Sequence, residues 1–203
     1  MRKMKLMLLT FAVAIVAMLI YTGSAECAWR PVVVASGAHS LVGKEATEFK
    51  LKSLDGKEVK LSELKDKVVM LNFIATYSAT SKKEVVAIEK LYQKYKEKDP
   101  KKESKFVVLG IMSTPEKSKE KVQKFVTKYK ITFPMLIGAS KTFKDYKVNQ
   151  LPTVFYINKD GMIYSVHSGP VTCDEKSMTA DIEKVMANAP IPPATGQTVI
   201  VCD

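Results

Sequence analysis

Cysteine, histidine and glycine are all scarce in this chain of 203 residues. It has 3 Cys and 2 His, too few for a multi-ligand zinc cluster or an iron–sulfur centre. The 9 Gly form no glycine-rich loop of the kind that holds nucleotide phosphates. We therefore expect no metal and no cofactor. Hydrophobic residues at 46% and charged residues at 26% are typical of a globular protein and exclude a wholly disordered chain.

The first 25 residues have the pattern of a secretory signal peptide. Arg2, Lys3 and Lys5 precede an apolar run at 6–21, and small residues lead up to Ala25. We favour cleavage after Ala25, with an uncleaved membrane anchor as the alternative. The sequence thus predicts an exported protein of the periplasm or cell envelope. It would contact the membrane only through this segment, if the segment is retained.

Export would place the three cysteines where disulfides persist. Cys27, Cys173 and Cys202 are odd in number, so at least one is free, mixed-bonded or intermolecular, and the pairing stays open. Cys173 follows Thr172, a candidate helix cap, and the first turn of a helix favours a reactive thiolate. We favour a structural disulfide of Cys173 with Cys202 or Cys27; a lone redox thiol at Cys173 is the alternative.

Arginine is almost absent beyond the leader. Removal of Arg2, Lys3 and Lys5 lowers the formal charge from +11 to +8 and leaves Arg30 as the only Arg. Nucleic-acid readers usually use Arg for bidentate contacts to bases. The lysines are interleaved with Asp and Glu, which is typical of a solvated surface. We therefore expect no nucleic-acid partner.

Hydrophobic periodicity predicts the order of the secondary-structure elements. Asp55-Gly56 lies between two alternating segments and predicts a hairpin. Two nearly continuous apolar runs predict buried strands at 68–74 and 106–112. The remaining pattern predicts a helix at 85–95, a helix from Pro115 behind the cap Thr114, a short extended segment at 133–137, a helical turn at 142–146, a hairpin at 153–167 and a helix from Thr172 to about Met186.

This order predicts an α/β fold with a central mixed β-sheet flanked by helices. Right-handed crossovers make the two buried strands parallel neighbours, whereas the closing hairpin is antiparallel. We expect a linker or arm at 26–42, a domain at 43–187 and a Pro-rich tail at 188–203.

The loop after the strand at 68–74 lies where ligands gather in such sheets, and from here the sequence resembles a known family. Residues 43–186 resemble redoxins of the TlpA/ResA type, related to the AhpC/TSA group. The likeness rests on the hairpin extension at 49–64, the strand at 68–76, the helix from Lys82-Lys83-Glu84, the segment Leu151-Pro152-Thr153 and the turn at 158–161. It implies a thioredoxin-like fold with an N-terminal β-hairpin extension and an exported thiol–disulfide oxidoreductase.

The chain departs from this family at the centre of the motif. Where the family carries Trp-Cys-x-x-Cys, this chain has Tyr77-Ser78-Ala79-Thr80-Ser81. Thiol–disulfide exchange needs a thiolate and a second, resolving thiol. A helix dipole worth about 1 kcal/mol cannot ionise a serine hydroxyl. We therefore expect the dithiol reaction to be absent, with Ser78, Thr80 and Ser81 capping the helix.

A serine nucleophile would need a base within reach. His39 lies in the predicted arm and His167 near the end of the closing hairpin. A Ser78–His167 pair is the one candidate, and nothing else in the sequence supports it. Glu84 falls where some family members hold an acid that assists proton transfer, but without thiols we expect a solvated helix residue.

The resemblance also implies that Pro152 is cis and presents backbone to an extended peptide. The groove would be lined by Tyr77, Ala79, Thr80, Leu151, Pro152 and Gly169. We therefore predict a degenerate member that binds an extended peptide or an envelope partner, as a holdase, scaffold or assembly factor in a thiol or cytochrome pathway. One alternative is an enzyme that uses Cys173, resolved by Cys202. Another is a normal oxidoreductase in which Ser78 and Ser81 are engineered replacements.

Overall fold

A computed structural model of the chain describes residues 37–96, 104–112, 118–169 and 175–192, and the backbone at 32–33 and 198–199. Val33–Gln197 form one compact unit, which carries the predicted domain. Separately, β1 (Val32–Val33) pairs with β9 (Thr198–Val199) in a two-stranded sheet. The predicted leader and all three cysteines lie outside the described residues. Among the described helices, none combines the length and the apolar character needed to cross a bilayer.

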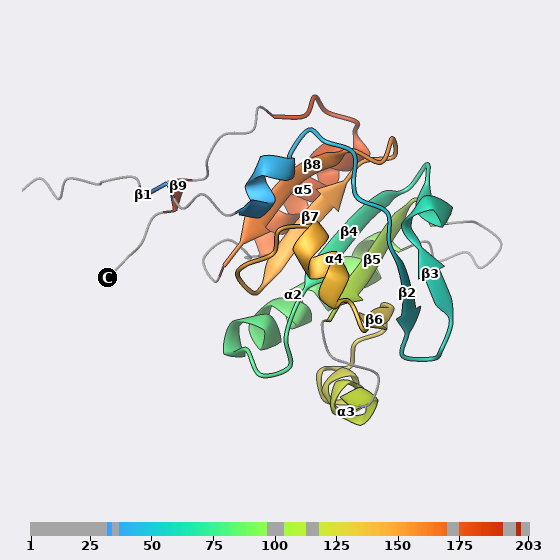
Figure 1. The fold of residues 1–203 in the computed structure, drawn as a ribbon. Helices are drawn as coiled ribbons and strands as arrows, with labels where there is room; N and C mark the ends of the chain where they lie inside the picture. Colours follow the sequence, from blue (N-terminus) through green and yellow to red (C-terminus); the bar gives the residue numbers. More distant parts are fainter. Residues whose placement is uncertain are drawn as a thin grey trace, which may run out of the picture. The chain divides into compact units, whose positions relative to one another are not determined.

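A seven-stranded mixed sheet forms the centre of the domain, in the order β3-β2-β6-β5-β4-β7-β8 (Figure 1). Its strands are β2 (Lys50–Ser53), β3 (Glu58–Lys60), β4 (Val68–Phe73), β5 (Phe106–Ile111), β6 (Met135–Ile137), β7 (Thr153–Ile157) and β8 (Ile163–Ser168). The predicted parallel pairing of β4 with β5 and antiparallel pairing of β7 with β8 are both confirmed.

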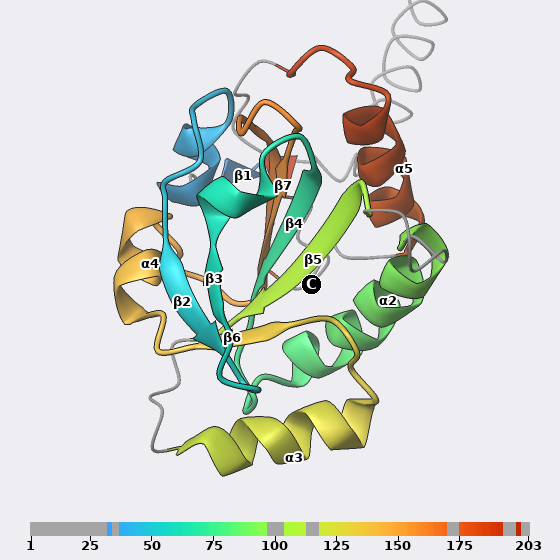
Figure 2. The ribbon, with the colours of Figure 1, turned by 90° about the vertical axis from the view of Figure 1, so that its right-hand side faces the viewer.

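Helices cover both faces of this sheet. The α-helices are α2 (Ala79–Tyr95), α3 (Lys119–Tyr129), α4 (Ser140–Asp145) and α5 (Glu175–Met186), and η1 (Gly37–Leu41) and η2 (Leu61–Leu64) are 3₁₀ helices. Figure 2 shows α2 and α5 on one side of the sheet and α4 on the other. The expected cap Thr114 with Pro115 and the cap Thr172 lie outside the described residues.

β4 is buried along its whole length because both of its faces are covered. Val68 and Met70 contribute to the core beneath α2, α3 and α5. Leu71 and Phe73 point to the opposite core, which also contains Ala38 of η1. Residues 37–41 therefore belong to the domain, although the sequence places them in the linker.

An aromatic cluster holds the second core together. The ring of Phe73 lies 5.0 Å from Phe143 and 5.4 Å from both Tyr146 and Phe155, between ring centroids. Tyr146 donates its hydroxyl to the Thr47 carbonyl at 2.8 Å. Burial raises the pKa of the Tyr146 phenol far above its usual value. Such ring pairs add about 0.5–1.5 kcal/mol each beyond their buried area, so they fix β4 and β7 at the end where the candidate site begins.

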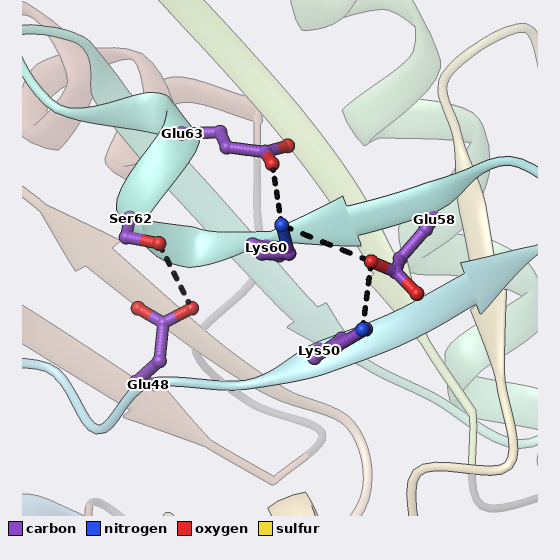
Figure 3. Close-up of polar contacts among 6 residues, drawn as sticks. All are labelled: Glu48, Lys50, Glu58, Lys60, Ser62 and Glu63. Atoms are coloured by element: carbon purple, nitrogen blue, oxygen red, sulfur yellow. Dashed lines mark hydrogen bonds and ion pairs between the residues drawn. The ribbon is translucent and has the colours of Figure 1, made fainter.

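The β2–β3 hairpin ends the sheet with a charged edge. Lys50 pairs with Glu58 at 3.0 Å, and Lys60 contacts both Glu58 and Glu63 (Figure 3). Each exposed pair contributes at most about 1 kcal/mol. Alternating charges on a terminal strand discourage its association with the edge of another sheet. The predicted hairpin extension therefore protects this edge of the sheet.

Candidate functional site

The candidate site begins where β4 leads into α2. Ser78 is the N-cap of α2: its side-chain oxygen accepts a hydrogen bond from the Ser81 N–H at 3.2 Å. This satisfies one of the backbone N–H groups that a helix start leaves without a partner. The expected capping role of Ser78 is confirmed. Tyr77, directly before the cap, exposes 82% of its surface.

Ser81 and Glu84 lie on the side of α2 that faces the sheet. Ser81 is completely buried, and its Oγ accepts the Ala75 N–H at 3.5 Å. Ser81 therefore supports the loop below the helix. Glu84 is only 3% exposed, so the expectation of a solvated residue is wrong. Its spacing from the buried Ile88 and Leu91 places it on the apolar face, a signal that the sequence contained.

The segment Leu151–Pro152 lies beside the end of β4. The antiparallel register pairs Phe73 with Thr153, so the residues after Phe73 and those before Thr153 leave the sheet at the same end. The Leu151–Pro152 peptide bond is cis. Gly169, with φ +87°, donates its N–H to the Pro152 carbonyl at 2.9 Å. The structure thus joins two predicted groove residues, Pro152 and Gly169, in one hydrogen bond.

Leu151 keeps its backbone available. In the described part of the chain, neither its N–H nor its carbonyl has a backbone hydrogen-bond partner. Thr153 donates its hydroxyl to the Gln150 carbonyl at 2.9 Å, which fixes the turn on the other side of Pro152. A backbone donor and acceptor at the end of a strand are what an extended peptide needs for strand addition.

His167 is engaged by a residue that the sequence analysis missed. Its Nε2 contacts Asp181 Oδ2 on α5, and its ring lies 5.6 Å from that of Tyr156. Ser78 Oγ instead accepts the Ser81 N–H. The described contacts thus give the two residues of the Ser78–His167 hypothesis different partners. No sequence pattern could have indicated Asp181, because it lies on a helix that only tertiary packing brings to β8.

The predicted site residues are only partly covered by the described structure. Tyr77, Ser78, Ala79, Thr80 and Ser81 occupy the start of α2, and Leu151, Pro152 and Gly169 flank β7 and β8. Cys27, Cys173 and Cys202 lie outside the described residues, so the predicted disulfide and the redox thiol stay predictions. Within the described ranges, no group of three or more His, Cys, Asp or Glu side chains is placed to bind a metal ion.

A protein-family model and curated relatives both match this chain. The model of the AhpC/TSA family matches residues 42–166. Thioredoxin-like protein YneN of Bacillus subtilis is 34% identical over 141 residues, which cover 70% of this chain and 79% of that protein. Thiol-disulfide oxidoreductase ResA of Halalkalibacterium halodurans is 36% identical over 131 residues, with coverages of 64% and 70%.

The fold is also found among solved structures. A thiol:disulfide interchange protein of the thioredoxin family from Chlorobium tepidum superposes with a TM-score of 0.59 at 20% identity. The match covers 70% of this chain and 95% of that one. At this identity the likeness concerns the fold alone, which is thioredoxin-like, as the sequence predicts.

Proposed function

The chain belongs to the AhpC/TSA family of thioredoxin-like thiol–disulfide oxidoreductases, and we propose that this member has lost the dithiol reaction and binds an extended peptide or an envelope protein. The observation that carries the proposal is the pair of hydroxyls, Ser78 and Ser81, at the start of α2. The proposal includes export to the periplasm or cell envelope, which the basic and apolar pattern at 1–25 supports.

Disulfide exchange at this position has no sulfur atom to proceed through. A thiolate must attack a disulfide, and a second thiol must resolve the mixed disulfide. Ser78 Oγ accepts from a backbone N–H, and no His, Asp or Glu side chain of the described residues hydrogen-bonds to it. Without a base the hydroxyl keeps its proton. The helix start therefore serves as a cap.

The features that would hold a peptide are still present. Leu151 offers a backbone N–H and carbonyl, and the exposed Tyr77 precedes the cap at the same end of the sheet. Backbone pairing supplies affinity that depends little on sequence, whereas an exposed aromatic ring anchors one side chain. An extended segment is the chemistry that fits both features.

A disulfide-reductase assay on the full chain tests the loss of chemistry. With dithiothreitol as the electron source and insulin as the substrate, we expect a rate equal to that without protein. Turnover that persists after Cys173→Ser would overturn the proposal. Turnover that disappears with Cys173→Ser would instead establish the alternative enzyme, with its thiol at Cys173.

Peptide binding is tested with an unfolded, carboxymethylated polypeptide, which offers no disulfide. Tyr77→Ala is expected to weaken binding about tenfold, since exposed aromatic anchors dominate such interfaces. Met186→Ala is the matched control, because Met186 is also a large exposed apolar residue, 42% exposed, but lies at the end of α5. Equal effects of the two substitutions, measured by fluorescence anisotropy, would contradict a site at Tyr77.

A further inference from the structure

Both histidines of the chain lie at one edge of the sheet. His167 is on β8, the last strand in the sheet order, and η1, which carries His39, packs on that strand. His167 Nε2 contacts Asp181 Oδ2, and these two side chains are only 15% and 17% exposed. Three elements, η1, β8 and α5, thus bring three ionisable side chains to the same edge.

Residues 37–46 cover part of this edge through backbone hydrogen bonds. Gly43 donates its N–H to the Ile163 carbonyl at 2.8 Å, and Ile163 donates its N–H to the Lys44 carbonyl at 2.9 Å. Ala38 is completely buried in the core below. The segment therefore shields backbone groups of β8 that an uncovered terminal strand would offer to another chain.

A proton on His39 conflicts with the docked position of this segment. Burial, and then the nearby charge of His167, lower the pKa of His39 below its ordinary value of 6.5. The His39 side chain is only partly exposed where η1 packs on β8. Among the described residues, the titratable and charged groups around this edge include Lys44 and Glu45 of the segment itself, His167 and Tyr164 on β8, Asp181 on α5, Tyr156 on β7 and Lys147 after α4, whose ammonium donates to Ser40.

We propose that residues 37–46 form an acid-sensitive cover of the β8 edge, which uptake of one proton by His39 releases. The proton comes from solvent and binds the imidazole. Release breaks the hydrogen bonds of residues 37–46 to Gly161, Ile163 and Lys147, and no covalent bond changes. Because the released segment binds this proton more readily than the docked one, acid favours release and neutral pH favours docking. The uptake of one proton limits the change in the equilibrium to about tenfold per pH unit.

Release would uncover the strand next to the candidate site. β8 ends at Ser168, and the next residue, Gly169, is hydrogen-bonded to Pro152. An exposed strand edge is a template for backbone pairing. The backbone groups that the cover pairs lie at 161–163, at the start of β8. Release would thus add a pH-dependent pairing surface at the end of this strand away from Gly169. This inference does not depend on the loss of the dithiol reaction.

Hydrogen–deuterium exchange of the full chain tests the cover. Protection factors for the backbone amides of Gly43, Ala46 and Ile163, whose hydrogen bonds hold the cover, are corrected for the intrinsic rate. They are compared between about pH 8 and about pH 5, the range in which histidine titrates. We expect protection in the wild type to fall with acidification, by up to about tenfold per pH unit. His39→Gln should abolish this fall, and His167→Gln should reduce it.

The matched control is Ser40→Ala, which changes an exposed neighbour in η1 and should leave the pH dependence in place. A wild-type fall that persists in His39→Gln would overturn the proposal. So would an equal loss of protection in the buried strands β4 and β5, because it would mean global unfolding. If His39→Gln does not fold, the His39 ring resonance in wild-type NMR spectra decides. The β8 amide exchange must follow the titration of that resonance and not that of His167.

Discussion

Gly110 of β5 and Met135 of β6 lie so close that a Cβ on Gly110 would displace the end of the Met135 side chain. A Cβ built on Gly110 would lie 2.2 Å from Met135 Sδ. The two residues are also partners in the parallel register of β5 and β6. Met135 belongs to the core cluster that also contains Val122 and Phe125 of α3.

Gly110→Ala is therefore expected to lower the free energy of unfolding by about 1–3 kcal/mol, the usual cost of overpacking. Denaturant unfolding of the variant measures this loss. A double-mutant cycle with Met135→Ala provides the control. Because the shortened side chain removes the clash, the double variant should be more stable than the sum of the single effects predicts. Strict additivity would contradict the contact.

The N-cap of α2 can be tested without any assumption about function. Ser78→Ala removes the acceptor for the Ser81 N–H and should cost about 1 kcal/mol of stability. Ser78→Asp restores an acceptor and adds a negative charge at the helix start, so its stability should stay close to that of the wild type. Thermal unfolding of the two variants gives the comparison. Equal losses would mean that the hydroxyl has another role.

Two thiols can be introduced at the start of α2. Ser78→Cys with Ser81→Cys places two thiols one helical turn apart, at the cap and in the first turn, where a thiolate is favoured. Backbone sites at this spacing lie within the range that a disulfide spans. We expect the double variant to form an intramolecular disulfide and to reduce insulin.

Ser78→Cys alone is the control for this experiment, because it lacks a resolving thiol and should form mixed disulfides without turnover. A double variant that folds but does not form the internal disulfide would show that the start of α2 lacks the geometry for exchange. Mass spectrometry under non-reducing conditions distinguishes the two results.

Local patterns in the sequence were sufficient to predict most of the architecture. The alternation around Asp55-Gly56 predicts the β2–β3 hairpin, and the apolar run at 68–74 predicts the buried strand β4. Both patterns depend only on residues that are neighbours along the chain. They can therefore be interpreted without knowledge of the fold. The hydroxyl at Ser78 likewise marks the start of α2, because capping is a local interaction.

Contacts between different secondary-structure elements were decided by the tertiary structure alone. Three features depend on how the helices pack on the sheet: the burial of Glu84, the contact of His167 with Asp181 and the docking of η1 against β8. Hydrophobic periodicity predicts which face of a helix or strand is apolar. It does not predict which polar group of another element will contact that face. The amino-acid sequence thus determined that two hydroxyls stand at the start of α2. Tertiary packing determined that His167 meets Asp181 and that η1 lies against β8, because these contacts join separate elements.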